Sequence, residues 1–237
     1  HTRYWRDWSS DVCSSDLVAD AENKGKLNRD PQQVKRVRGI GQRLIAQTGT
    51  FRPDARNWQW EINVITSDEL NAWCMPGGKI AFYTGILDQL ELNDAEVAAV
   101  MGHEVAHALR EHARERMGKS TATSIGARVG GALIAGALGI DPRITDYAAQ
   151  GAANLLTLKF SREDESEADL VGIELAARAG YDPRAGITLW EKMSAKAKGA
   201  PPQWLSTHPA GSTRIHDIEK NLPKVTPLYE RAPKAPA

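Results

Sequence analysis

The pentapeptide HEVAH at residues 103–107 constrains this chain more than any other stretch, because it lies in an apolar, helix-periodic run at 94–117. Two histidines four residues apart project from one face of a helix, so the rings of His103 and His107 can converge on one metal ion. Glu104 lies beside that ion and can reach water there. The alternative is a pair of solvated histidines on a charged face. Burial is favoured by an apolar stripe along the helix, formed by Val97, Val100, Met101, Val105, Ala108 and Leu109.

A second helical segment supplies a candidate for the third protein ligand that a catalytic zinc site needs. Ser161 can cap this segment and Gly180 can end it. Glu165 and Asp169 lie four residues apart and therefore share a face. We interpret Glu165 as a metal ligand and Asp169 as a hydrogen-bond partner of a ligand histidine. The alternative is an acidic, solvated helix start, which the helix dipole would stabilise. The HEVAH motif upstream favours the ligand interpretation.

Together these motifs resemble the gluzincin zinc metalloendopeptidases of the forty-eighth metallopeptidase family, which includes HtpX, BepA, LoiP, Oma and CAAX-prenyl proteases. The resemblance covers roughly residues 31–222. It implies an α+β, mainly helical zincin-type domain in which a small β-sheet precedes the HExxH helix. Beyond HExxH and ExxxD, the similar segments are NAWCMPGG at 71–78, SR at 161–162, AGYDP at 179–183, STHP at 206–209 and RI at 214–215.

The resemblance implies one zinc ion per chain, bound by His103, His107 and Glu165. In such sites zinc lowers the pKa of water toward about 7, and Glu104 would take the proton and pass it to the leaving amine. The expected function is hydrolysis of peptide bonds in misfolded or misassembled envelope proteins. The alternative is a zinc-stabilised chaperone or assembly factor for outer-membrane proteins with little proteolysis. The presence of Glu104 favours the protease, because a pure binder needs no base.

Periodicity predicts further helices and three strands around these motifs. Asn93 and Glu96 are typical of a capping box before the HEVAH helix, and Gly118 of its end. The predicted helices lie at 31–47, 94–117, 144–160, 161–180 and 183–198. The predicted strands lie at 58–65, 71–75 and 79–84, with a Pro-Gly-Gly turn between the last two.

The strand at 71–75 has a functional interpretation through the resemblance. In gluzincins an edge strand beside the zinc adds the substrate as a further strand, so that backbone hydrogen bonds provide affinity. The alternative is an ordinary hairpin in a small α+β domain. The residues that the resemblance assigns to substrate binding are Asn71, Ala72, Trp73 and Cys74.

His208 and Arg214 lie in the late motifs, and the resemblance places both at the active site. His208 is expected either to occupy the open zinc position of a latent enzyme or to stabilise the oxyanion of the tetrahedral intermediate. Arg214 is expected to orient that segment or to form a salt bridge within the site. Without the resemblance, His208 would be interpreted as a surface loop residue. His112 and His216 are expected at exposed helix positions.

The resemblance and the composition divide the chain into four parts. Residues 6–17, RDWSSDVCSSDL, are similar to an in-frame translation of a common sequencing adaptor, so residues 1–17 are expected to be non-native. A natural disordered tail is the alternative. Residues 18–30 are expected to be a linker, 31–222 the catalytic domain, and 223–237 a disordered tail. With no repeat after the catalytic region, the chain resembles the compact, LoiP-like bacterial periplasmic members.

The balanced charge gives no indication of a nucleic-acid partner, and the hydropathy gives no indication of a membrane span. Lysine plus arginine number 30 and aspartate plus glutamate 30. The apolar run 130–140, within segment 120–140, is too short for a span of about 20 residues. The resemblance implies protein or peptide substrates, unfolded outer-membrane proteins among them, and a periplasmic or outer-membrane-associated location. Peripheral or lipid-anchored membrane association stays an open alternative.

Overall fold

The computed structural model describes residues 17–116, 159–197, 203–209 and 212–235. Three predictions concern residues outside these ranges: the adaptor-like start at 1–17, the apolar segment 120–140 and the helix expected at 144–160. Of these segments only residues 17, 159 and 160 are described.

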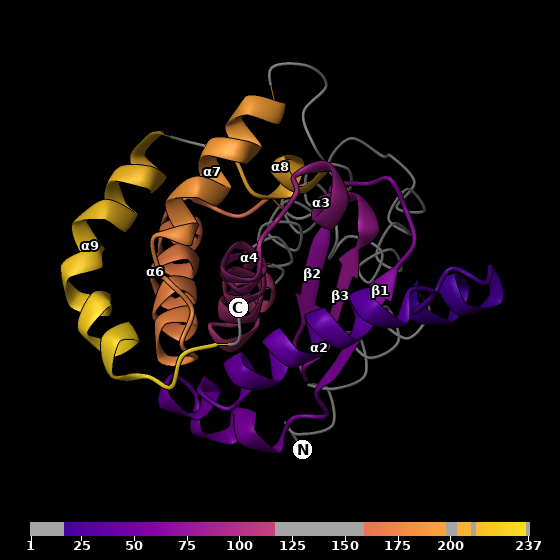
Figure 1. Cartoon of the computed structure of the whole chain (residues 1–237), viewed down its shortest axis with the longest axis horizontal. Helices are drawn as coiled ribbons and strands as arrows, with labels where there is room; N and C mark the ends of the chain where they lie inside the picture. Colours follow the sequence, from indigo (N-terminus) through magenta and orange to yellow (C-terminus); the bar gives the residue numbers. More distant parts are fainter. Residues whose placement is uncertain (1–16, 117–158, 198–202, 210–211, 236–237) are drawn as a thin grey trace, which may run out of the picture.

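The described residues form a mainly helical domain with one small sheet. Figure 1 shows α4 between the sheet and α6, with α9 on the outer side of α6 and α2 beside the sheet. This arrangement confirms the predicted α+β fold, in which the sheet precedes the HEVAH helix. In chain order the elements are α2 (Pro31–Ile45), the 3-10 helices η1 (Thr48–Thr50) and η2 (Pro53–Asn57), β1 (Glu61–Ile65), β2 (Ala72–Met75), β3 (Lys79–Tyr83), α3 (Thr84–Gln89), α4 (Asp94–Leu109), α6 (Arg162–Arg178), α7 (Ala185–Lys196), α8 (Gln203–Thr207) and α9 (Ser212–Arg231).

The sheet has the order β1-β3-β2, which makes β2 an edge strand of the three strands that the described residues form. β1 pairs with β3 in parallel, with Glu61 opposite Lys79. β2 pairs with β3 antiparallel, with Ala72 opposite Phe82. β2 also packs against α4, and every residue of β2 is buried. One edge strand therefore lies directly beside the HEVAH helix.

The start of α4 follows from its sequence, but its end differs from the prediction. Asn93 and Glu96 form the predicted capping box. The helix ends at Leu109 rather than near residue 117, because Glu111 takes a left-handed conformation with φ of 57°. Arg52 stabilises this turn by donating to the Leu109 carbonyl and to Glu111. Residues 112–116 are helical again after this turn.

Two glycines set the distance between α4 and α6. A Cβ atom on Gly102 would lie 2.6 Å from the carbonyl oxygen of Gly172, and one on Gly172 would lie 2.7 Å from the amide nitrogen of His103. No Cβ tolerates such a contact, so the two backbones approach this closely only because both residues are glycine. The close approach brings His103 up to the face of α6.

The segment before α2 and the segment after residue 222 both differ from their predictions. Residues 17–23 are helical, Leu27 bridges Ile65 of β1, and Ala21 is buried, so 18–30 is not a free linker. α9 continues through two prolines to Arg231, where a disordered tail was predicted. The helix continues beyond residue 222 because Val225 is buried in the core and Leu222 and Leu228 pack against it. Among the described residues, no helix combines the length and the apolarity needed to cross a membrane.

Candidate metal centre

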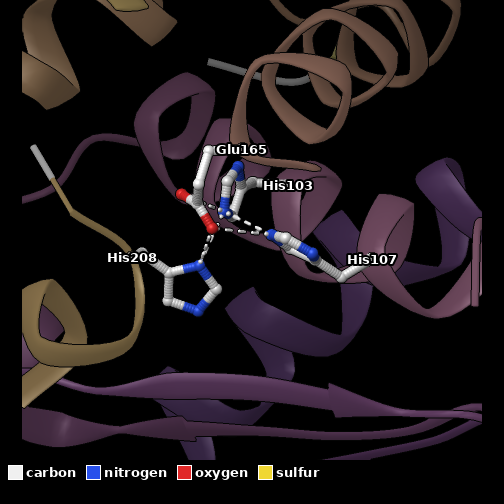
Figure 2. A group of neighbouring side chains, drawn as sticks. All are labelled: His103, His107, Glu165 and His208. Atoms are coloured by element: carbon white, nitrogen blue, oxygen red, sulfur yellow. Dashed lines mark hydrogen bonds and ion pairs between the residues drawn. The ribbon is translucent and has the colours of Figure 1, made fainter. Parts of the chain in front are cut away.

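Four side chains from three parts of the chain meet at one point. His103 and His107 come from α4, Glu165 comes from the first turns of α6, and His208 directly follows α8. Figure 2 shows the four side chains directed toward one another. One ligand atom from each lies within 4.8 Å of all the others, and all four residues are buried. The structure thus brings together the three predicted ligands and adds His208 as a fourth donor.

The spacing of these atoms fits a small tetrahedral cation. The distance from His103 Nε2 is 3.1 Å both to His107 Nε2 and to His208 Nδ1. Glu165 Oε1 lies 3.3 Å from His107 Nε2 and 2.9 Å from His208 Nδ1. Zinc bonds of about 2.0–2.1 Å in tetrahedral geometry place ligand atoms about 3.3 Å apart. Imidazole nitrogens and a carboxylate are also the donors that zinc prefers, so the residues fit zinc.

Asp169 contacts Nδ1 of His103, the ring nitrogen that does not belong to the donor cluster. Its Oδ1 lies 3.0 Å from His103 Nδ1, as the sequence predicts for a partner of a ligand histidine. A carboxylate accepts the Nδ1 proton, which leaves the Nε2 lone pair directed at the donor cluster. The contact with Asp169 therefore favours the tautomer in which His103 can bind a metal.

Arg214 of α9 lies behind the ligands. Its Nε donates to Asp169 Oδ2 at 2.6 Å and its Nη2 to Asp169 Oδ1 at 2.7 Å, while its Nη1 donates to Glu165. The guanidinium carbon stacks 3.7 Å above the ring centroid of Trp190. Arg214 thus forms salt bridges with Glu165 and Asp169 within the site, and its Nη1 also donates to the carbonyl of Pro209, next to His208.

Trp204, which the sequence analysis missed, binds the expected general base. The indole Nε1 donates to Glu104 Oε1 at 2.6 Å, and the Trp204 ring stacks on that of His208 with centroids 4.9 Å apart. Trp204 is fully buried. Its place four residues before His208 is the signal that could have revealed it, since such a spacing across a helical turn places both side chains on one side; the backbone N–H of His208 donates to the Trp204 carbonyl at 2.9 Å.

The structure contradicts the expectation that His112 lies at an exposed helix position. This histidine is only 2% exposed, not a surface residue, and its Nδ1 lies 3.0 Å from Nδ1 of His107. The turn at Glu111 brings it back toward the site, which a continuous helix would not do. His216 is exposed, as predicted. Phe160, also missed, packs against His107 with ring centroids 4.0 Å apart and the rings tilted.

Burial and mutual contacts shift several pKa values in the cluster. Burial lowers the pKa of His107 well below its usual value. Burial opposes ionisation of Glu165, but its contacts with His107 and His208 outweigh burial and hold the pKa of Glu165 low. Burial likewise opposes ionisation of Asp169, and Arg214 and His103 hold its pKa below the usual range. Burial also opposes protonation of His208, whose pKa is nevertheless raised by Glu104 and Glu165. The cluster therefore carries ionised carboxylates, which favours a bound cation.

A cleft opens beside the donor cluster, between β2 and α4. It is lined on one side by residues 71–76, which include the four residues predicted to bind substrate. Glu104, His107 and His208 line the other side. The side chain of Trp73 packs into a separate apolar cluster with Ala21, so in this strand the backbone, not the indole, is the part suited to bind a ligand.

Comparisons with known proteins bear on the same part of the chain. Residues 31–222 match the sequence profile described as Peptidase family M48. The chain is 39% identical over 155 residues to the mitochondrial metalloendopeptidase OMA1 of Arabidopsis thaliana, covering 65% of this chain and 30% of that protein. It is 35% identical over 190 residues to the OMA1 of Schizosaccharomyces pombe, covering 79% and 52%. It is 26% identical over 219 residues to the beta-barrel assembly-enhancing protease of Escherichia coli K12, covering 89% and 43%. The chain spans about half or less of the length of these relatives.

Proposed function

Because the chain belongs to peptidase family M48, we propose that it is a zinc-dependent metalloendopeptidase with Glu104 as its general base. The observation that carries the proposal is the convergence of four buried donors beside Glu104, in a cleft that an edge strand also lines. His103, His107 and Glu165 would hold the ion. A chaperone that only binds its partners would not need a general base at the position of Glu104.

Each step of the reaction can be assigned to a group of this chain. A zinc ion in the site would lower the pKa of water from 15.7 toward about 7 and polarise the peptide carbonyl. The Glu104 carboxylate accepts a proton from the attacking water and then delivers it to the leaving amine. Asp169 keeps the ring of His103 in its ligand tautomer, and Arg214 holds the carboxylates of Asp169 and Glu165 in place.

The structure describes a closed arrangement of the site, and we propose that α8 moves when substrate binds. His208 Nδ1 lies within the donor set, in the position that water needs, and Trp204 binds the base. This placement supports the latency role of His208 over stabilisation of an oxyanion. Both contacts come from α8 and the residue that directly follows it, so a single displacement would release the zinc position and Glu104 together.

The edge strand β2 is the proposed binding site for the substrate backbone. Residues 71–74 line the cleft, and β2 is the edge strand of the three described strands. A peptide added along this edge would form backbone hydrogen bonds whatever its side chains are. Such binding suits a protease that cleaves unfolded segments of different sequence.

We also propose a substrate class and a location, and these rest on the names of the relatives. One relative is named a beta-barrel assembly-enhancing protease, which supports unfolded outer-membrane proteins as substrates and the bacterial envelope as the location. Other relatives are named mitochondrial metalloendopeptidases. The grouping with compact LoiP-like members stays a prediction, as does peripheral or lipid-anchored association with a membrane.

A digest with controlled metal content tests the proposed activity. Purified protein is incubated with casein and with an unfolded β-barrel protein, in the untreated form, after chelation, and after zinc is restored. We expect cleavage that chelation abolishes and zinc restores. Binding of the β-barrel protein without cleavage in all three samples would favour a zinc-stabilised chaperone and would overturn the proposal.

A further inference from the structure

The two histidines of the HEVAH motif have different partners at Nδ1. His103 Nδ1 contacts a carboxylate of α6, whereas His107 Nδ1 contacts the ring of another histidine, His112. Nothing in the reaction described above uses His112 or its neighbour Glu167. We propose that His112 and Glu167 are positioning residues that fix the tautomer of the ligand histidine His107. The inference rests on the proposed zinc site.

The contacts form a continuous chain from the site to the surface. His107 Nδ1 and His112 Nδ1 are 3.0 Å apart, and His112 Nε2 lies 3.1 Å from Glu167 Oε2. Arg110 Nε holds the other carboxylate oxygen of Glu167 at 3.0 Å. His112 is buried, while the side chain of Glu167 is 46% exposed. Arg110 and His112 flank the turn at Glu111 that follows α4, and Glu167 lies two residues after Glu165 in α6.

Glu167, the acceptor at the end of this series of contacts, determines the direction of every hydrogen bond in the series. An ionised carboxylate only accepts, so His112 must donate from Nε2 to Glu167. The Nδ1 of neutral His112 then carries no proton and accepts from Nδ1–H of His107. A neutral imidazole holds one proton, so Nε2 of His107 is left with a free lone pair.

The opposite tautomer would prevent the site from forming. A proton on Nε2 of His107 would occupy the space among the donors, where Nε2 of His103 is 3.1 Å and Oε1 of Glu165 3.3 Å away, and would remove one metal ligand. Removal of the hydrogen-bond partner of a ligand histidine typically lowers metal affinity by roughly 10–100-fold. His112 therefore accepts the Nδ1 proton of His107 as Asp169 accepts that of His103, with a ring nitrogen in place of a carboxylate oxygen.

Two substitutions at His112 separate this role from simple filling of space. His112→Phe keeps the ring volume and removes the acceptor, whereas His112→Asn loses volume but places an amide oxygen near the position of Nδ1. We expect zinc affinity, measured by chelator competition, to fall roughly 10–100-fold in His112→Phe and only a few-fold in His112→Asn. The Co²⁺-substituted proteins should rank in the same order by the loss of the tetrahedral absorption band. His216→Phe, at an exposed position, is the matched control and should bind zinc as the wild type does.

The opposite ranking would overturn the proposal. If His112 only fills space, His112→Phe should bind zinc as tightly as the wild type and His112→Asn should be the weaker variant. If His112→Phe does not fold, as judged by circular dichroism of the metal-free form, Glu167→Ala provides the test, with Glu163→Ala as the exposed control on the same helix. Unchanged zinc affinity in Glu167→Ala would then contradict the proposal. These readouts do not depend on cleavage, so failure of the proposed protease activity would be seen separately.

Discussion

The indole nitrogen of Trp204 donates to Oε1 of Glu104 at 2.6 Å, which joins the proposed general base to a short helix one hundred residues later in the chain. The same helix directs His208 into the donor cluster. In the proposed mechanism, a base that is already hydrogen-bonded and a water position that is already filled would hold the protease inactive. We therefore propose that displacement of α8 precedes catalysis.

Trp204→Phe should loosen this closed arrangement. Phenylalanine keeps an aromatic ring against His208 and removes the donor to Glu104. A hydrogen bond to a charged group contributes about 1.5–3 kcal/mol, so α8 should be held less tightly. We expect faster casein cleavage together with a lower midpoint of thermal unfolding. A slower rate at unchanged zinc content would instead mean that Trp204 orients the base for catalysis.

His208→Ala distinguishes the two roles considered for this histidine. If His208 occupies the water position, its removal should raise the cleavage rate while His103, His107 and Glu165 retain zinc. If it stabilises the oxyanion, the rate should fall by roughly 10²–10³-fold, as for loss of one oxyanion donor. We expect the increase. The rate is measured with casein, zinc content is determined in the same sample, and His216→Ala is the control.

Gly102→Ala should disrupt the zinc site without changing any ligand. The added Cβ would lie 2.6 Å from the Gly172 carbonyl oxygen and would push α4 away from α6. We expect a loss of about 1–3 kcal/mol in the free energy of unfolding, as for overpacking, and weaker zinc binding. Gly39→Ala, in α2, meets no atom within 4 Å and should be neutral or stabilising by up to about 1 kcal/mol. Equal effects of the two substitutions would exclude this account of the helix contact.

Removal of the metal should lower thermal stability, because a ligand that binds only the folded state stabilises it. At a zinc concentration one hundred times the dissociation constant, the effect is about 2.7 kcal/mol. Chelation should therefore lower the unfolding midpoint of the wild type and leave that of Glu165→Ala nearly unchanged. Differential scanning calorimetry with and without chelator measures both. A chelator effect of the same size in Glu165→Ala would show that the metal binds elsewhere.

Local patterns predicted the parts of the site that lie within helices. The four-residue spacings of His103 with His107, and of Glu165 with Asp169, place each pair on one helix face whatever the rest of the chain does. The capping box at Asn93 likewise depends only on neighbouring residues. Such features need no knowledge of tertiary structure, which is why the sequence reveals them.

The missed features depend on contacts between distant parts of the chain. His112 is buried because Glu111 adopts a left-handed conformation that Arg52, far away in the sequence, helps to hold. Trp204 reaches Glu104 only through the packing of α8. The helix through Pro223 forms because burial of apolar residues of α9 outweighs the cost of proline. No local pattern encodes these outcomes.

The most direct test of the account is the rate at which zinc-loaded Glu104→Gln cleaves casein. Glutamine has the size of glutamate and an amide oxygen that can still accept from Trp204, but it cannot take a proton from water. The donor cluster is unchanged, so elemental analysis of the same sample should show one zinc ion per chain. We expect cleavage to fall by roughly 10²–10⁴-fold, the usual contribution of a general base. A rate within a few-fold of the wild type would contradict the assignment of Glu104, and with it the proposed mechanism.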